Sequence, residues 1–151
     1  MKTAIVYYSK HHGNTKKLID AIAAADPDLV TIDVTEASSA DLSSFDVIGV
    51  ASGIYYSKFA KQVTAFLEAN LPRSRKVFAL FTCGQIRPAY TDGIKKLASE
   101  YSCDYIGEYG CLGFDTFGPF KLIGGLAKGH PTPIEIEGAV TFYEHKVKQE
   151  N

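Results

Sequence analysis

The stretch that decides the fold is residues 3–15, with the sequence TAIVYYSKHHGNT. Its first six residues form an apolar run that is typical of a buried strand, and its last seven are mostly polar and include one glycine. A helical pattern follows at once, with Leu18, Ile22 and Ala25 on one face. A strand, a polar loop and a helix in this order predict the first unit of a parallel α/β sheet.

The rest of the chain repeats this alternation. Further strands are predicted at residues 29–34, 46–51, 76–82 and 103–112, the first of them half-buried or at an edge. One predicted helix carries Phe59, Val63, Phe66 and Leu67 on its apolar face, and the last helix starts at Thr132 with a capping box and a proline. We expect one α/β domain over residues 1–151: a three-layer sandwich around a five-stranded parallel sheet of order 2-1-3-4-5.

Composition argues against several classes of protein. The chain carries 16 basic and 17 acidic residues, a net charge of −1, which attracts neither nucleic acid nor an anionic membrane. No apolar run reaches the ~18–20 residues that cross a bilayer, so we expect no membrane insertion. The N-terminus lacks signal-peptide features, which predicts a cytoplasmic protein. The three cysteines form no metal motif, and their odd number indicates free thiols.

A phosphate site is predicted where the first and third strands end, because ligands of open α/β sheets bind where the strand order reverses. The loop from Ser9 to Thr15 leads into a helix N-terminus, whose N–H groups and dipole favour a dianionic phosphate. The loop has no Walker A sequence, so nucleotide triphosphatase chemistry is not indicated. The alternative is that Asn14 or Thr15 merely caps the helix, with His11 and His12 solvated.

Three segments, residues 9–15, 51–59 and 82–85, resemble the flavodoxin family. The second, ASGIYYSKF, is also similar to the flavodoxin-type protoporphyrinogen oxidases of bacteria. The resemblance implies a flavodoxin-like domain that binds FMN noncovalently. It assigns the FMN phosphate to the side chains of Ser9, Asn14 and Thr15 and to the backbone of His11, His12 and Gly13.

The same resemblance places the flavin ring against the loops after the third and fourth strands. The residues that it assigns there are Ser52, Gly53, Tyr55, Tyr56, Thr82, Cys83, Gly84 and Gln85. Either Tyr55 or Tyr56 could stack on the ring, while one of the two packs on the following helix. Gly84 would let the backbone approach the pyrimidine edge. Cys83 is expected to fill space beside the ring, because nothing in the sequence activates its thiol.

Two features leave room for an enzyme. Arg87 follows the third loop of a nearly neutral chain; it either lies near the flavin and stabilises an anionic hydroquinone, or faces solvent. Residues 113–131, with five glycines and three phenylalanines, are longer than a usual loop. They form a flap or partner surface that carries the phenylalanines, or the phenylalanines close the core and residues 122–126 form a short buried helix.

The function expected from this pattern is FMN binding with electron transfer to a redox partner protein or a small-molecule electron acceptor. The alternative is an FMN-dependent oxidoreductase that acts on a quinone or porphyrinogen-like molecule. A cofactor-free interaction or receiver domain is a third class. A receiver domain, however, needs acidic residues after the first strand and an aspartate after the third, where this chain has Ser9 and Ser52.

Overall fold

The computed structural model describes residues 1–10 and 12–149. Its strands are β1 (Thr3–Tyr8), β2 (Val30–Asp33), β3 (Val47–Tyr55), β4 (Lys58–Phe59), β5 (Lys76–Cys83) and β6 (Asp104–Leu112). Its α-helices are α1 (Asn14–Ala25), α2 (Lys61–Asn70), α3 (Asp92–Glu100) and α4 (Pro133–Phe142). Two 3₁₀ helices, η1 (Pro88–Thr91) and η2 (Gly118–Ile123), and a π-helical turn after α4, η3 (Tyr143–Val147), complete the secondary structure.

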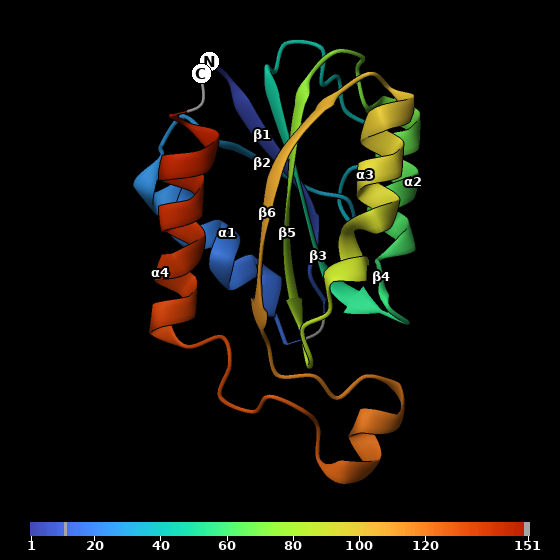
Figure 1. Ribbon diagram of the computed structural model, residues 1–151, viewed down its shortest axis with the longest axis vertical. Helices are drawn as coiled ribbons and strands as arrows, with labels where there is room; N and C mark the ends of the chain where they lie inside the picture. Colours follow the sequence, from blue (N-terminus) through green and yellow to red (C-terminus); the bar gives the residue numbers. More distant parts are fainter. Residues whose placement is uncertain (11, 150–151) are drawn as a thin grey trace.

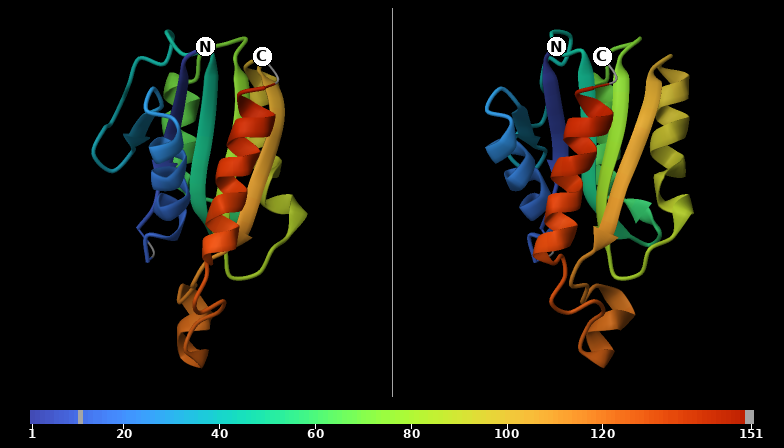
Figure 2. Two further views of the ribbon diagram at one scale, coloured as in Figure 1. Left: turned by 90° about the vertical axis from the view of Figure 1, so that its left-hand side faces the viewer. Right: turned by 60° about the vertical axis from the view of Figure 1, so that its left-hand side comes forward.

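Five strands form a parallel sheet in the order β2-β1-β3-β5-β6, which confirms the predicted topology. Helices α1 and α4 cover one face of this sheet, and α2 and α3 cover the other (Figures 1 and 2). The central strands β1, β3 and β5 are covered on both faces, which explains their continuous apolar sequences. Strand β2 lies at the edge and exposes Val30. The result is the expected three-layer sandwich.

Each face of the sheet has its own hydrophobic core. The core under α2 and α3 includes Phe66 and Leu97, and the core under α1 and α4 includes Ile22 and the fully buried Tyr143. The Tyr143 hydroxyl donates to Oδ2 of Asp26 at 2.7 Å, so the polar end of this large side chain is satisfied. The predicted capping box of α4 is present at Thr132.

Two glycines that weaken the strand pattern of β6 have structural reasons. A Cβ atom on Gly110 would lie 2.1 Å from the ring of Phe81 on the neighbouring strand, so a side chain there would displace that ring. Gly107 has a φ of 145° and lies beside the register shift between Val77 and Phe78 on β5. The strand therefore needs glycine where strand propensity disfavours it.

The prediction that Phe59 belongs to the second helix is wrong. Strand β3 continues to Tyr55 and turns back through Tyr56 and Ser57 into the antiparallel β4, which contains Phe59. Phe59 is nevertheless buried and packs on Phe81 with ring centroids 6.1 Å apart. The helical spacing correctly placed it in the same core as Val63, but the hairpin could not be seen in the apolar spacing.

The alternative of a short buried helix at residues 122–126 is also wrong. The helical turn is η2, and its last residues, Leu122 and Ile123, are 88% and 70% exposed. Residues 113–131 leave the end of β6, extend beyond the carboxyl edge of the sheet and return to α4 (Figure 1). Among the described residues, no helix combines the length and apolarity that a bilayer crossing requires.

Candidate functional site

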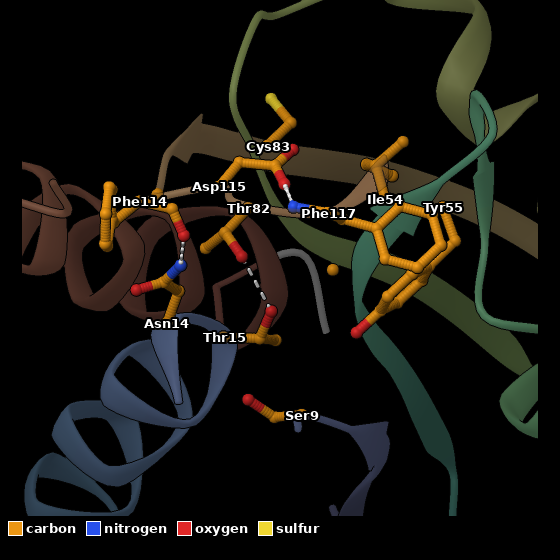
Figure 3. Close-up of a pocket in the computed structure, with 12 residues that line it drawn as sticks. Ser9, Asn14, Thr15, Ile54, Tyr55, Thr82, Cys83, Phe114, Asp115 and Phe117 are labelled. Carbon is orange, nitrogen blue, oxygen red and sulfur yellow. Dashed lines mark hydrogen bonds between the residues drawn. The ribbon is translucent and has the colours of Figure 1, made fainter. Parts of the chain in front are cut away.

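The loops that follow β1, β3, β5 and β6 surround a cavity at the carboxyl edge of the sheet (Figure 3). It lies where the strand order reverses between β1 and β3, the usual ligand position in open α/β sheets. The lining residues are Ser9, Asn14, Thr15, Gly53, Ile54, Tyr55, Thr82, Cys83, Gly113, Phe114, Asp115 and Phe117. The structure therefore brings residues from all three predicted loops together.

The first wall of the cavity is the start of α1. Gly13, the residue before this helix, has a φ of 64° and offers no side chain to cap it, and the first turn of α1 holds no carboxylate. The Ser9 hydroxyl accepts a hydrogen bond from the Lys16 N–H at 3.0 Å, which ties the loop to the helix. The first N–H groups of a helix have no intrahelical partners, and together with the helix dipole they favour an anion at this end.

Asn14 and Thr15, the first residues of α1, are buried and do not cap the helix. Asn14 Nδ2 donates to the Phe114 carbonyl at 2.8 Å, while the buried Asn14 Oδ1 has no hydrogen-bond partner among the residues that the structure describes. Thr15 Oγ1 lies 2.8 Å from Thr82 Oγ1 (Figure 3). An unsatisfied buried acceptor costs free energy, so a ligand hydroxyl that donates to Asn14 Oδ1 would stabilise the site.

His12 is not among the described residues that line this cavity. His12 is exposed, and its Nε2 lies 2.9 Å from Thr116 Oγ1. Its ring also packs on Phe114, with centroids 4.6 Å apart. His12 therefore links the loop after β1 to residues 113–131 and is not simply solvated. His11 lies outside the described residues.

Ser52 stabilises the second wall of the cavity, which is the end of β3 from Gly53 to Tyr55. It is fully buried; its hydroxyl donates to the Gly53 carbonyl at 2.6 Å and accepts from the Ala60 N–H at 2.9 Å. These bonds hold the end of β3 against the start of α2. Ser52 is not among the residues that line the cavity, whereas Gly53 is.

The structure separates the roles of Tyr55 and Tyr56. Tyr55 is half-buried in the cavity wall and meets Tyr8 and Phe117 edge-on, at centroid distances of 5.9 and 5.1 Å. Burial, reinforced by Tyr8 and Asp115, raises the pKa of Tyr55 to about 12, so its hydroxyl stays neutral. Tyr56 is 81% exposed and meets Phe117 from another side, at 5.2 Å. Phe117 therefore contacts both tyrosines.

The loop after β5 forms the third wall and the floor of a second hollow. Tyr56, Cys83, Gly84, Gln85 and Phe117 are among the residues that line this hollow. Burial raises the pKa of the Cys83 thiol to about 12, with smaller contributions from nearby carboxylates. Cys83 is therefore a neutral thiol and a weak nucleophile, in agreement with its predicted space-filling role. All three cysteines are free, as predicted.

Residues 113–131 cover this third wall. A Cβ atom on Gly84 would lie 3.0 Å from the Cβ of Asp115 and 3.1 Å from that of Leu126, so glycine is needed for the segment to pack here. Asp115 and Leu126 exchange backbone hydrogen bonds of 2.8 and 2.7 Å. The flap interpretation of this segment agrees with its position over the cavity.

The charge that reaches the cavity is negative. Asp115 lines both hollows, and its Oδ1 accepts from the Phe117 N–H at 2.8 Å. Arg87 is exposed at the rim of the second hollow, with Nη2 3.4 Å from Gln85 Oε1. Arg87 thus lies exposed at the rim of one hollow, whereas Asp115 lines both.

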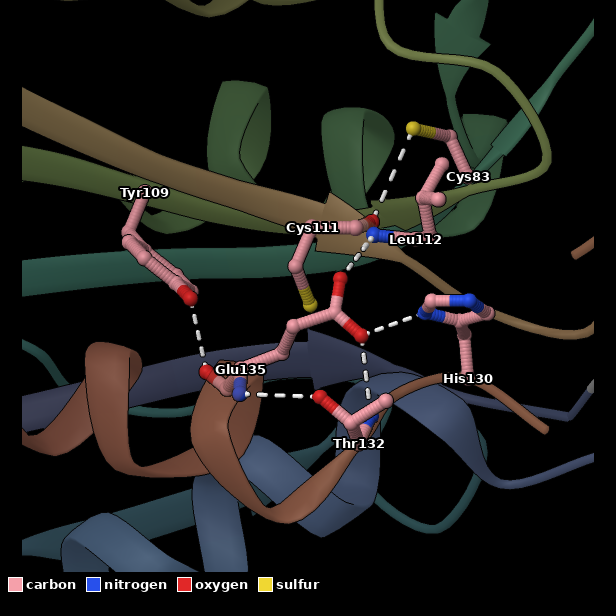
Figure 4. Close-up of polar contacts among 7 residues, drawn as sticks. All are labelled: Cys83, Tyr109, Cys111, Leu112, His130, Thr132 and Glu135. Carbon is pink, nitrogen blue, oxygen red and sulfur yellow. Dashed lines mark hydrogen bonds and ion pairs between the residues drawn. The ribbon is translucent and has the colours of Figure 1, made fainter.

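Glu135 joins the two ends of residues 113–131, which we call the neck of this segment (Figure 4). Its carboxylate accepts hydrogen bonds from the Leu112 N–H at 3.2 Å and the Thr132 N–H at 2.9 Å, and contacts His130 Nδ1 at 2.5 Å. Burial opposes ionisation of Glu135, but these hydrogen bonds outweigh it and hold the pKa of the carboxyl below its usual range. One side chain thus joins the end of β6 to the start of α4.

Sequence analysis missed several residues of the site. Ile54 lies within the quoted segment 51–59 but was not assigned to the site. Gly113, Asp115 and Phe117 carry no motif, although the segment that contains them was singled out by its length. Its position after the last strand indicated the right edge of the sheet. The particular side chains that turn inward depend on contacts with α1 and β3, which sequence patterns do not show.

Comparison with known proteins gives a family match. Residues 5–105 match the family model described as a flavodoxin domain. An uncharacterised protein of Methanocaldococcus jannaschii is 33% identical over 151 residues, which cover 98% of this chain and 99% of that protein.

Solved structures agree in fold. A flavodoxin from the domain Archaea superposes with a TM-score of 0.70 at 19% identity, covering 99% of both chains. A flavoprotein from Lactobacillus acidophilus, solved in complex with FMN, gives a TM-score of 0.59 at 19% identity and covers 73% of this chain and 92% of its own. At these identities the likeness establishes the architecture.

Proposed function

The chain belongs to the flavodoxin family, and on this premise we propose that it binds FMN noncovalently and transfers electrons to a redox partner protein or a small-molecule acceptor. The observation that carries the proposal is the start of α1, where Gly13 offers no capping side chain and Asn14 and Thr15 line one cavity with Ser9. The flavoprotein from Lactobacillus acidophilus, which shares the fold, is a complex with FMN.

The residues of the cavity fit FMN at its phosphate end. The start of α1 and the Ser9 and Thr15 hydroxyls would hold the phosphate, and Asn14 Oδ1, a buried acceptor without a partner, would accept from a hydroxyl of the ribityl chain. Tyr55, Tyr56 and the loop from Thr82 to Gln85 would border the ring. When bound, FMN would supply one- and two-electron redox chemistry that side chains lack.

The carboxylate of Asp115 favours the electron carrier over the two-electron enzyme. It lines both hollows, whereas Arg87 is exposed at the rim. A negative charge beside a bound flavin disfavours the anionic hydroquinone and lowers the potential of the last reduction step. We therefore expect the last reduction step of FMN to have a higher potential in the Asp115→Asn variant than in the parent. A potentiometric titration of the FMN-loaded protein measures this.

Flavin titration of the apo-protein tests FMN binding directly. The phosphate makes at least two charge-assisted hydrogen bonds in this proposal, so FMN should bind about 100-fold more tightly than riboflavin. Ser9→Ala should weaken FMN binding about tenfold and leave riboflavin unchanged. Ser99→Ala, an exposed serine on α3, is the matched control. A protein that takes up neither flavin, or binds both equally, would refute the proposal.

A second candidate is an FMN-dependent oxidoreductase acting on a quinone or porphyrinogen-like molecule. The hollow beneath Phe117 and Pro119 favours it, because this hollow offers space beside the proposed ring position. Anaerobic mixing of the reduced, FMN-loaded protein with a quinone separates the two functions. An enzyme gives rates that saturate with quinone concentration as two electrons and two protons pass to the quinone. A carrier gives rates that rise linearly.

A further inference from the structure

A third hollow opens between the end of β1 and the start of α2, with a volume of about 480 Å³. It shares Tyr55 and Phe117 with the cavity and Tyr56 with the second hollow, whereas Tyr8 lines this one alone. The four aromatic rings stand roughly perpendicular in neighbouring pairs, at 74° to 89° between planes. Together with Phe59, they are the aromatic residues among the described lining of the hollow.

The same hollow is positively charged. Lys58 and Lys61 line it, both are exposed, and neither forms an ion pair with a described residue. By contrast, Lys16, Lys95 and Lys148 each lie within 3.3 Å of a carboxylate oxygen. None of the described lining residues is acidic, and α2 starts without a side-chain cap or a first-turn carboxylate. Two exposed lysines thus line the hollow, and no described residue that lines it carries a counter-charge.

We propose that this hollow is a binding site for a planar aromatic anion, such as a one- or two-ring carboxylate or sulfonate. Aromatic walls bind a flat ring by stacked and edge-on contacts, and the two lysines pair with its anionic group. The volume suits a small organic ligand. The occupant is a small molecule, because the aromatic residues line a concave site and not a flat patch.

The proposal extends the proposed function. Tyr55 and Phe117 also border the proposed flavin position, so a ligand in the hollow would be one aromatic layer away from FMN. The site therefore suits the small-molecule acceptor or donor of the flavoprotein. That role rests on the proposed function, but binding of the anion itself does not need FMN.

Three redox-inactive probes separate the contributions of ring and charge. Isothermal titration calorimetry would compare 2-naphthalenesulfonate with 2-naphthalenemethanol, which lacks the charge, and with cyclohexanesulfonate, which lacks the aromatic ring. The aromatic sulfonate should bind at least about fivefold more tightly than either of the others. Affinity should be the same with and without FMN. Equal affinity for all three probes, or displacement of the sulfonate by FMN, would overturn the proposal.

Variants locate the site on the protein. Lys58→Gln/Lys61→Gln should weaken the sulfonate about fivefold to tenfold and leave the alcohol unchanged. Tyr8→Leu should weaken both aromatic probes. The control is Lys2→Gln/Lys17→Gln, which removes two exposed lysines elsewhere. Urea unfolding checks that every variant is folded. If the control pair reduces binding as much as the Lys58 and Lys61 pair, the attraction is general and the site does not exist.

Discussion

Two regions that face the same cavity are built in opposite ways. The loop of residues 9–15 is short, and it ends in Asn14 and Thr15, which are buried in α1. Residues 113–131 are long, and their helical turn η2 contains no buried residue. The first region takes its geometry from a strand and a helix that flank it directly. The second keeps its place through a few contacts with distant parts of the chain.

Those contacts are concentrated at the base of the longer region. Asn14 binds the Phe114 carbonyl, Asp115 pairs with Leu126, and Glu135 ties both ends together. The tip, which contains η2 (orange), extends away from the sheet (Figure 2), and Leu122 and Ile123 at the end of η2 are strongly exposed. The comparison suggests that the base sets the shape of the site, while the tip adds little to the stability of the fold.

The largest effect is expected where the two regions meet. In Gly113→Ala, the new Cβ would lie 2.8 Å from Asn14 Nδ2 and 3.0 Å from its Cβ, so the Asn14–Phe114 hydrogen bond would be disturbed. We expect a loss of about 1–3 kcal/mol in the free energy of unfolding, measured in urea, and weaker FMN binding. Gly93→Ala, with open space around its Cβ, should not destabilise. Equal results for the two variants would contradict this account.

The next effect concerns the neck. Glu135→Gln keeps the shape of the side chain but removes the negative charge of the carboxylate, which accepts hydrogen bonds from the Leu112 and Thr132 N–H groups. We therefore expect the free energy of unfolding to fall by about 1–2 kcal/mol at neutral pH. The pKa of Glu135 is lower in the folded than in the unfolded protein. Its contribution is therefore fully present above the ordinary value of 4.5 and is lost as pH falls through the folded pKa.

The pH dependence of urea unfolding checks this sign. The parent should lose stability more steeply than Glu135→Gln as pH falls below 4.5, because only the parent loses this contribution. Asp26, whose pKa is also lowered, is present in both proteins, so it contributes equally to the pH dependence of their free energies of unfolding. Parallel pH profiles would show that Glu135 does not stabilise the neck as a carboxylate.

A smaller effect of opposite sign is expected at the β3–β4 hairpin. Tyr56 and Ser57 have φ values of 50° and 65°, a left-handed conformation that Asn-Gly adopts more readily in two-residue hairpins. Tyr56→Asn/Ser57→Gly should raise the free energy of unfolding by about 1 kcal/mol. It should also weaken FMN binding, because the ring of Tyr56 is lost. Ser57→Gly alone should also raise the free energy of unfolding, but it should leave FMN affinity unchanged because Tyr56 is retained. If neither variant is more stable than the parent, the hairpin is not strained.

The smallest effect is expected at the tip. Leu122→Ser/Ile123→Ser replaces two strongly exposed side chains, so urea unfolding should change by less than about 0.5 kcal/mol. FMN affinity should also stay the same, because neither residue lines a described hollow. A loss comparable with that of Gly113→Ala would show that the tip packs against the protein, contrary to the comparison above.

The sequence by itself determined the alternation of strands and helices, the position of the loop from Ser9 to Thr15 and the capping box at Thr132. These features depend on apolar periodicity and on backbone preferences that act within a few residues. Only the tertiary structure decided that Tyr55 is the half-buried tyrosine, that Phe59 belongs to a hairpin, and that Asp115 and Phe117 enter the site. Those outcomes depend on contacts such as Asn14 with Phe114, 100 residues apart, which exist only after packing brings the segments together.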